Sequence, residues 1–388
     1  MKKHLVSLGS GALLLGLAPA IAVAAPASAS ASAGESPVTG HVYVNDNTAG
    51  TNTIGAFDRH ADGTLTTEPG SPFPAGGGGT GAGLASQGAI QFAAGGRFVL
   101  AADAGSNQIS VLRVNRNGSL SRVPGGVVSS GGATPVSIAV HGSLVYVANA
   151  GTAATNYTGF RFLGGHLFRI PGSTVTLPSA AQPGDVLFNG TGTKLVGTRV
   201  GTSQIDSFTV SIGGRLTPAP GSPFQAQGLG PFGSEFRPTN PSQLFVSNAH
   251  NTAADSGTVS AFTDSFRGTL TPVAGSPFAD DQMAPCWVEI SHDGRFLFTV
   301  NTASGTISRF SIAPGGALTL LGSTPVAATG GVGAVDARLS PDGRYLYVDE
   351  SKIGSVGIFA VAGGTLTELP ASPVKLPAGA TPAGIIAS

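Results

Sequence analysis

The sequence predicts an all-β protein, a seven-bladed β-propeller of four-stranded antiparallel blades. A Gly-x-Leu tripeptide recurs along the chain, short apolar runs lie between its copies, and no stretch shows a helical period. The copies begin at Gly63, Gly118, Gly165, Gly214, Gly268, Gly316 and Gly364. Near-equal repeats of four short strands are typical of a propeller. The alternative, a pair of β-sandwiches, gives no reason for seven equal repeats.

Each repeat supplies four strands, which we name A to D from the innermost outward. Gly-x-Leu predicts the turn between strands C and D, because glycine readily takes a positive φ and leucine starts the next strand. Strand B is an apolar run such as 145–147 or 346–348. Strand A precedes it, and turns such as His292-Asp293-Gly294 join the two as hairpins.

The two ends of the repeat region predict how the ring closes. The first repeat starts with a B strand at 41–45, whereas the last residues, 383–387, read as an A strand. The C-terminal strand should therefore complete the first blade and cover an edge that would otherwise expose unpaired backbone groups. We expect residues 35–388 to form a single propeller domain.

Residues 1–34 predict a signal peptide followed by an Ala/Ser-rich leader. Lys2 and Lys3 precede a largely apolar stretch, and Ala22-Val23-Ala24 offers a small-residue cleavage site. Glycines and a proline interrupt this stretch, which argues against the alternative of a membrane anchor. We expect a secreted, extracellular protein with no membrane contact after cleavage.

Composition narrows the choice of partners. The formal net charge is zero and no run of Lys or Arg occurs, so a nucleic-acid partner is not expected. The single cysteine, Cys286, excludes an intramolecular disulfide. No metal-binding motif, phosphate loop or Gly-x-Ser-x-Gly nucleophile motif is present, and we expect neither a cofactor nor a bound metal. We expect a monomer that binds a small lactone or carbohydrate-like ligand.

One family shares the blade motifs of this chain. The segments 340–350, 355–359 and 364–366, and the related 291–301, resemble the blade signature of seven-bladed lactonase-type propellers. That family includes 6-phosphogluconolactonase and carboxymuconate-cyclase relatives, and Gly-Ser-Pro-Phe segments such as 70–73 resemble those of its exported members. The resemblance implies hydrolysis or isomerisation of a lactone. It carries over no catalytic residue, because no catalytic motif aligns.

Alternating strand direction places the D–A and B–C connections on one face, and their varied lengths favour a site there, at the mouth of a central channel. In one register, polar residues end all seven B strands: Asp46, Asp103, Asn149, Arg199, Asn248, Asn301 and Glu350. Asp and Asn suit turn capping. Arg199 and Glu350 are poor turn formers, so we assign them to substrate binding.

The inner strands carry the candidate catalytic groups. Glu235, Glu289 and Arg338 fall at equivalent places in consecutive repeats. We predict either glutamate as the general base for attack by water and the arginine as a clamp on a carbonyl or carboxylate. Three further substrate contacts are predicted, namely Asp185, Asp336 and His250. The alternative is a set of ion pairs between blades that line a water-filled channel.

Two functions therefore remain open. The first is an exported lactonase-like enzyme, and the second is a non-catalytic extracellular propeller that binds a glycan, a peptide or a component of the cell envelope. The same scaffold carries unrelated functions, so the choice depends on the site. Convergence of the Glu235, Glu289 and Arg338 side chains would favour the enzyme, and separate ion pairs would favour the binding protein.

Overall fold

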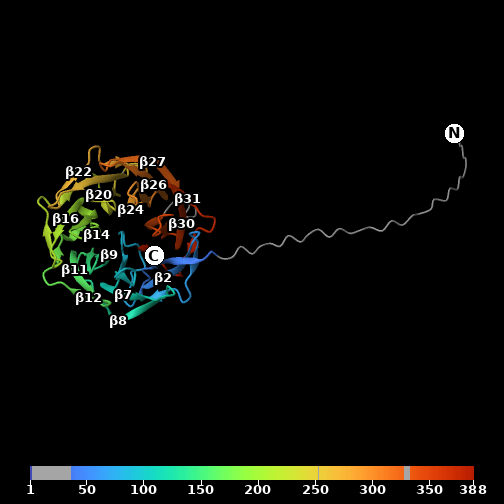
Figure 1. Cartoon of the computed structure of the whole chain (residues 1–388), viewed down its shortest axis with the longest axis horizontal. Coiled ribbons are helices and arrows are strands. Elements are labelled where there is room, and N and C mark those ends of the chain that lie inside the picture. Colours follow the sequence, from blue (N-terminus) through green and yellow to red (C-terminus); the bar gives the residue numbers. More distant parts are fainter. Residues whose placement is uncertain (2–35, 252, 327–332) are drawn as a thin grey trace. The chain divides into compact units, whose positions relative to one another are not determined.

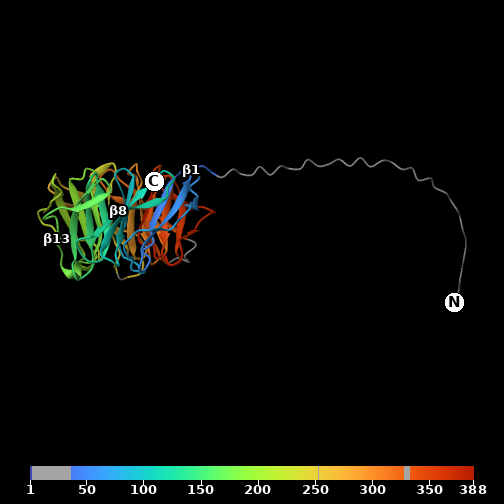
Figure 2. The ribbon, with the colours of Figure 1, turned by 90° about the horizontal axis from the view of Figure 1, so that it is seen from below.

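A computed structural model describes Met1 and residues 36–251, 253–326 and 333–388. The chain divides into Met1–Glu35 and Ser36–Ser388. The predicted signal peptide and leader lie outside the described residues except for Met1. Ser36–Ser388 forms seven antiparallel sheets arranged as blades around a centre, which confirms the predicted propeller (Figures 1 and 2). No helix in the described part of the chain is long and apolar enough to cross a membrane.

The first four blades follow the chain in order. Blade 1 contains β1 (Val38–Asn45), β2 (Thr53–His60), β3 (Leu65–Thr67), β4 (Phe73–Pro74) and β33 (Ile385–Ala387). Blade 2 contains β5 (Ile90–Ala93), β6 (Phe98–Asp103), β7 (Gln108–Val114) and β8 (Leu120–Ser129). Blade 3 contains β9 (Pro135–His141), β10 (Leu144–Asn149), β11 (Asn156–Leu163), β12 (His166–Arg169) and β13 (Val175–Thr176). Blade 4 contains β14 (Pro183–Phe188), β15 (Lys194–Arg199), β16 (Gln204–Val210), β17 (Leu216–Pro218) and β18 (Phe224–Gln225), with 3-10 turns η1 (Ser179–Ala181) and η2 (Val200–Thr202) beside it.

The remaining three blades repeat this arrangement. Blade 5 contains β19 (Pro231–Arg237), β20 (Asn240–Asn248), β21 (Thr258–Asp264), β22 (Leu270–Pro272) and β23 (Phe278–Ala279). Blade 6 contains β24 (Pro285–Ile290), β25 (Phe296–Asn301), β26 (Thr306–Ile312) and β27 (Leu318–Pro325). Blade 7 contains β28 (Ala334–Leu339), β29 (Tyr345–Glu350), β30 (Ser355–Ala362), β31 (Thr365–Glu368) and β32 (Val374–Lys375). In Figure 1, β9 and β14 lie toward the centre of the ring, and β8, β12 and β22 lie at its rim.

The Gly-x-Leu turns adopt the predicted conformation. All seven glycines have φ between 80° and 94°, a region that side chains with a Cβ rarely enter. The leucine that follows each of them starts or lies in the fourth strand, as Leu65 does in β3 and Leu318 in β27. These turns also join neighbouring blades, because tyrosine hydroxyls of B strands donate to the turn glycine carbonyls. Tyr43 donates to Gly118 at 2.7 Å and Tyr146 to Gly214 at 2.6 Å.

Closure of the ring by the two ends of the propeller is confirmed. β33 pairs antiparallel with β1, with Val42 opposite Ala387, Tyr43 opposite Ile386 and Val44 opposite Ile385. The amide of Ser388 donates to the carbonyl of His41 at 2.8 Å, which extends the pairing by one residue. The side chains of Ile385 and Ile386 are buried, so the last strand contributes to the core as well as to the sheet.

The Gly-Ser-Pro-Phe segments mark a break in the fourth strand. The serine hydroxyl accepts a hydrogen bond from a third-strand amide at the break, as in Ala56 N–H to Ser71 Oγ at 2.8 Å and Ala261 N–H to Ser276 Oγ at 2.8 Å. The phenylalanine then resumes pairing, so that Phe73 lies opposite Ile54. This motif therefore satisfies a backbone amide that the interrupted strand cannot reach.

The polar residues at the ends of the B strands connect strands B and C within a blade. Arg199 binds Asp206 with Nε–Oδ2 and Nη2–Oδ1 distances of 2.6 Å. Asn301 Nδ2 donates to Ser308 Oγ at 2.8 Å, and the hydroxyl of Ser110 donates to Asp103. The register predicted from sequence is present, and Asp103, Arg199 and Asn301 crosslink the sheet at the face formed by the D–A and B–C connections.

Candidate functional site

Three charged side chains occupy one register position in consecutive blades. Glu235 lies opposite Phe245, Glu289 opposite Phe298 and Arg338 opposite Tyr347. Each partner is three residues before the polar residue that ends its strand, namely Asn248, Asn301 or Glu350. The inner strands of blades 5, 6 and 7 therefore hold these charges at one level of the ring, as the repeat spacing predicted.

Two of the three charges form an ion pair between blades. Arg338 Nη1 lies 3.2 Å from Glu289 Oε2, and the other carboxylate oxygen accepts the amide of Leu339 at 3.0 Å. Arg338 Nε has no hydrogen-bond partner in the described part of the chain, and 24% of its side chain is exposed. Nε is itself buried, so Glu289 holds the guanidinium at Nη1 and leaves Nη2 without a hydrogen bond among the described residues.

Glu235 is the third member, and its carboxylate has no hydrogen bond or ion pair among the described residues. It is partly exposed, whereas Glu289 is buried. The pKa of Glu235 is raised to about 8, first by burial and then by the negative charge of Glu289, while Arg338 opposes the shift. Burial alone would lower the pKa of Arg338, but the carboxylates of Glu289, Asp336 and Glu235 outweigh burial and raise it. We call Glu235, Glu289 and Arg338 the central charged cluster.

Two buried aspartates flank the central charged cluster and accept hydrogen bonds from backbone amides. Asp185 accepts hydrogen bonds from Ser137 Oγ at 3.1 Å and from the Ser234 amide at 3.1 Å, which connects blade 4 to the blades on both sides. Asp336 accepts the amides of Ala337 at 2.9 Å and Gly88 at 3.3 Å. Burial raises the pKa of Asp185 to about 6 and that of Asp336 to about 7. Their predicted role in substrate binding stays a prediction.

Residues 86–88, which we call the channel segment, cross the centre of the ring. Gln87 Nε2 lies 3.2 Å from the carbonyl oxygens of both Ser234 and Val288, and Gln87 Oε1 accepts the Val288 amide at 3.0 Å. The segment comes from the connection that precedes β5, and Gln87 is 4% exposed. The sequence did not predict it, because a Gln in a Gly- and Ala-rich connection carries no pattern that distinguishes it from a surface loop.

The channel segment separates the central charged cluster from the predicted mouth. Each A strand begins at the face of the D–A connections and runs toward the A–B turns. In β24, the A strand of blade 6, Trp287 therefore lies closer to the D–A face than Glu289 does. Because Gln87 binds at Ser234 and Val288, both glutamates lie one residue beyond it, toward the A–B turns. The channel segment therefore lies between the central charged cluster and the face on which a site was expected, since a connection folds inward to satisfy backbone groups at the centre.

A cavity of about 500 Å³ lies at the predicted mouth, on the other side of the channel segment. Its walls are mainly apolar and include Leu84, Phe232 and Trp287, with His250 at the rim. The rings of Phe232 and Trp287 meet edge to face, with centroids 5.1 Å apart, and the indole Nε1 donates to the Ser86 carbonyl at 2.8 Å. No carboxylate lines this cavity in the described part of the chain.

The cysteine of this cavity is a poor nucleophile. Burial raises the pKa of the Cys286 thiol to about 12, so it stays protonated at neutral pH. His250 is exposed, and its ring packs on Gly230. The cavity therefore offers an aromatic binding surface with one histidine at its edge.

The two predicted rim contacts lie within their own blades. The guanidinium of Arg199 forms an ion pair with Asp206, and only 12% of the Arg199 side chain is exposed. Glu350 is fully buried, neither of its carboxylate oxygens has a hydrogen-bond partner in the described structure, and burial raises its pKa to about 7. Contact of either residue with a ligand stays a prediction.

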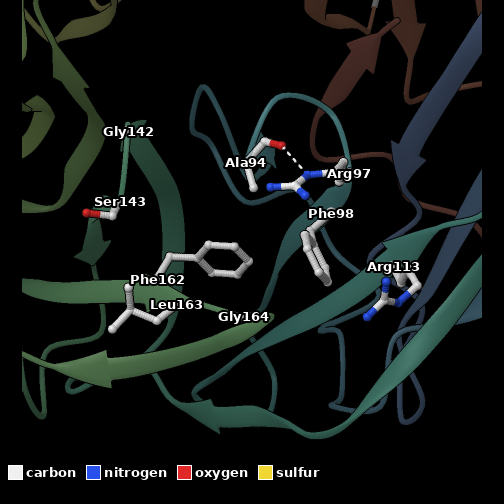
Figure 3. Close-up of a pocket in the computed structure, with 9 residues that line it drawn as sticks. All are labelled: Ala94, Arg97, Phe98, Arg113, Gly142, Ser143, Phe162, Leu163 and Gly164. Atoms are coloured by element: carbon white, nitrogen blue, oxygen red, sulfur yellow. Dashed lines mark hydrogen bonds between the residues drawn. The ribbon is translucent and has the colours of Figure 1, made fainter.

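A further cavity of about 400 Å³ lies between blades 2 and 3 (Figure 3). Phe98 and Phe162 face each other there at 5.3 Å, and Arg113 lies over the Phe98 ring at 5.1 Å. Arg97 donates to the Ala94 carbonyl at 3.0 Å instead of pointing into the space. This cavity has neither the carboxylates of the central charged cluster nor a buried polar group, and we do not assign a catalytic site to it.

Comparisons with known proteins agree with this fold. Residues 236–382 match the family described as lactonase, 7-bladed beta-propeller. No curated protein matches the sequence. The chain is similar to the periplasmic gluconolactonase of Pseudomonas aeruginosa, with 17% identity, coverage of 90% of this chain and 98% of that chain, and a TM-score of 0.68. A proposed 6-phosphogluconolactonase from Bacteroides uniformis ATCC 8492 has 18% identity, coverage of 90% and 99%, and a TM-score of 0.69.

Proposed function

We propose that the chain is an exported enzyme that hydrolyses a lactone or related cyclic ester at the central charged cluster, and the match of residues 236–382 to the seven-bladed lactonase family supports this. The observation that carries this proposal is the state of Glu235. Its carboxylate is partly exposed, has no protein partner among the described residues, and lies in the field of Glu289 and Arg338. A titratable group with such a shifted pKa is a candidate for acid–base catalysis.

In this proposal Glu235 transfers the protons of the hydrolysis and Arg338 stabilises the negative charge that develops. Deprotonated Glu235 takes a proton from a water molecule as the water oxygen bonds to the lactone carbonyl carbon. Arg338 Nη2, which Glu289 does not hold, stabilises the oxyanion that forms on the carbonyl oxygen. The ring C–O bond then breaks, the leaving oxygen takes the proton back from Glu235, and the hydroxy acid is released with loss of its own proton.

Glu289 acts in this scheme as a positioning residue. Its contacts with Arg338 Nη1 and the Leu339 amide hold the guanidinium against the inner strand of blade 7. Its charge also keeps the pKa of Glu235 high, so the base becomes available only as the pH approaches about 8. Sequence reasoning left Glu289 and Glu235 as alternative bases, and the geometry favours Glu235.

The direct test is a hydrolysis assay on a panel of γ- and δ-lactones, sugar lactones and lactonised products of aromatic-ring cleavage. The full chain should release acid from at least one class, with and without a chelator. Loss of activity in Glu235→Gln, with retention in Asp342→Asn, would support the site. Absence of turnover on every class would contradict the enzymatic proposal.

One observation favours the second candidate function, a non-catalytic binding protein. The apolar cavity at Trp287 suits a ligand with a flat or apolar face, and no carboxylate reaches it in the described residues. Trp287 is the single tryptophan of the chain, so its fluorescence reports on this cavity directly. A glycan or peptide that quenches the fluorescence while no lactone is hydrolysed would favour the binding protein.

Export is the remaining part of the proposal. The basic start, apolar stretch and Ala22-Val23-Ala24 site support cleavage that leaves a mature chain beginning between about residues 25 and 35. N-terminal sequencing of the protein recovered outside the cell tests this. A recovered chain that still begins at Met1 would contradict it.

A further inference from the structure

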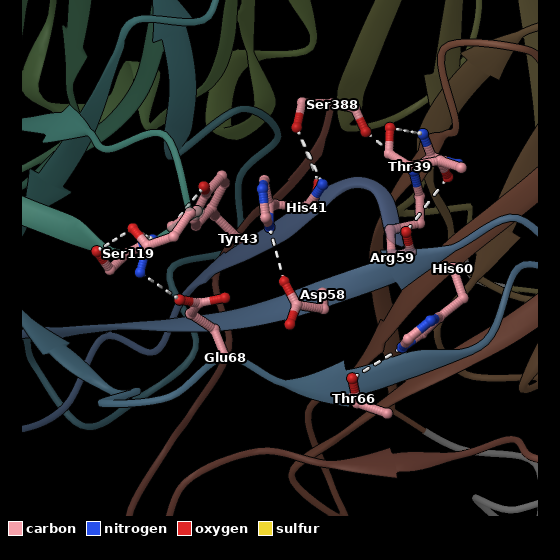
Figure 4. Close-up of polar contacts among 12 residues, drawn as sticks. Thr39, His41, Tyr43, Asp58, Arg59, His60, Thr66, Glu68, Ser119 and Ser388 are labelled. Atoms are coloured by element: carbon pink, nitrogen blue, oxygen red, sulfur yellow. Dashed lines mark hydrogen bonds and ion pairs between the residues drawn. The ribbon is translucent and has the colours of Figure 1, made fainter. Parts of the chain in front are cut away.

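A second cluster of titratable side chains lies far from the centre of the ring, where the first blade closes. His41 of β1 lies opposite Asp58 of β2 in the sheet, and Glu68 follows β3. One ligand atom from each, an imidazole nitrogen or a carboxylate oxygen, lies within 4.8 Å of the other two. Figure 4 shows the three side chains turned toward one another.

The cluster is sheltered from solvent and combines two carboxylates with one imidazole. Glu68 is 2% exposed, and the exposed fractions of the His41 and Asp58 side chains are 17% and 21%. His41 Nδ1 lies 3.1 Å from Asp58 Oδ1, so the two form an ion pair when the imidazole is protonated, and this buried nitrogen has no other partner among the described residues. The Glu68 carboxylate accepts a hydrogen bond from Asn117 Nδ2 at a long 3.4 Å.

We propose that His41, Asp58 and Glu68 bind a first-row divalent cation, with Zn²⁺ as the best fit. One imidazole nitrogen and two carboxylate oxygens form a ligand set that such ions accept. Ligands about 2.0–2.2 Å from a central Zn²⁺ lie at most about 4.4 Å apart, so small side-chain rotations would complete the site.

The position of the cluster gives the metal a consequence for stability. The backbone of His41 pairs with the C-terminus, since the Ser388 amide donates to its carbonyl at 2.8 Å and its own amide donates to Ser388 Oγ at 3.1 Å. The next blade also contacts this residue, because a Cβ on Gly118 would overlap the His41 ring. A cation on His41 and Asp58 would therefore stabilise β1 between the closing strand and blade 2.

The test is titration of the chelator-treated full chain with ZnCl₂ by isothermal calorimetry. The variants are His41→Gln and Glu68→Gln, and the control is His292→Gln, which removes an exposed histidine in an A–B turn. Wild type and control should bind Zn²⁺ with the same affinity at a site that both cluster variants weaken by about tenfold or more. Far-UV circular dichroism confirms that each variant is folded.

Amide hydrogen exchange gives a second readout. Zn²⁺ should slow exchange of the Ser388 and Ile386 amides in wild type and leave them unchanged in Glu68→Gln. Wild type that binds no Zn²⁺, or cluster variants that keep its full affinity, would overturn the proposal. Lactone hydrolysis is measured separately, so failure of this site leaves the proposed function untouched.

Discussion

Glu289 joins two blades through one side chain, with Oε2 3.2 Å from Arg338 Nη1 and Oε1 3.0 Å from the Leu339 amide. Such a pair is costly to break from one side, because the remaining charge stays buried without a partner. The arrangement leaves Glu235 as the carboxylate of the central charged cluster that has no partner among the described residues. The centre of the ring therefore holds one glutamate in an ion pair and one glutamate that can titrate as an acid or base.

Glu289→Gln should shift the titration of Glu235 to lower pH. The charge of Glu289 raises the pKa of Glu235 and that of Arg338 lowers it, so Arg338→Met should shift the titration the opposite way. Carbon-13 NMR of labelled glutamate carboxyl groups measures this without activity. Asp342→Asn, which removes an exposed aspartate paired with Arg344, serves as the control. A Glu235 titration that both central variants leave unchanged would contradict the coupling.

Gln87→Ala should destabilise the propeller although it removes no apolar packing. The substitution leaves the Val288 amide and the carbonyls of Ser234 and Val288 without their partner at the centre. We expect a loss of about 1–3 kcal/mol in the free energy of unfolding, measured by urea denaturation. Gln225→Ala removes an exposed glutamine that donates to the Ser203 carbonyl and should change the stability by less. Equal effects of the two substitutions would contradict a structural role for the channel segment.

The closing strand should be essential for stability. Ile386→Ala truncates a side chain that is 2% exposed and should cost about 2–5 kcal/mol, and deletion of residues 383–388 should cost more because it exposes the edge of β1. Ile212→Ala, at a fully exposed position, should stay within about 0.5 kcal/mol of wild type. Thermal and urea melts compare the proteins. An unchanged melting temperature in the deletion variant would refute closure by β33.

Buried Asp46 should make the protein less stable as the pH rises. Burial raises its pKa in the folded state to about 7, above the ordinary value of 3.8. The folded state therefore holds a proton that the unfolded state releases, and this stabilisation is full below about pH 4 and is lost as the pH rises toward 7. Asp46→Asn should flatten that part of the pH–stability profile. The same slope in wild type and variant would contradict the assignment.

The pKa of the exposed Asp342 is shifted in the opposite direction to that of Asp46. Hydrogen bonds from Ser340 and Arg344 outweigh burial and lower its pKa to about 2. Its contribution is therefore present above its ordinary pKa and is lost as the pH falls through about 2. Asp342→Asn should leave the profile between pH 4 and 7 as it is in wild type, and a flattened profile there would show that the Asp46 effect is not specific.

The fold could be predicted from sequence because its signals are local and repeated. A positive φ at each Gly-x-Leu glycine, the apolar B strands and the closing strand follow from turn chemistry and from the need to cover a sheet edge. The register of Glu235, Glu289 and Arg338 followed from the same repeat. The propeller, its closure and this alignment are all present in the structure.

The site was harder to predict because its contacts join distant segments. Gln87 binds strands about 150 and 200 residues away, and nothing near it in sequence marks it as central. His41, Asp58 and Glu68 also look unrelated until β1, β2 and β3 are paired. Arg199 and Glu350 stood out as unusual turn residues, yet the partner of Arg199, Asp206, lies on the neighbouring strand of the same blade.

The pH dependence of lactone hydrolysis by wild type and Glu235→Gln tests the central claim most directly. For a responsive lactone, kcat/KM of wild type should rise as the pH passes through about 8 and level off above it, because the base must lose its proton. Glu235→Gln should lose this dependence together with about 10²–10⁴ of the rate. A variant that keeps the wild-type rate and profile would contradict the assignment of Glu235 as the base.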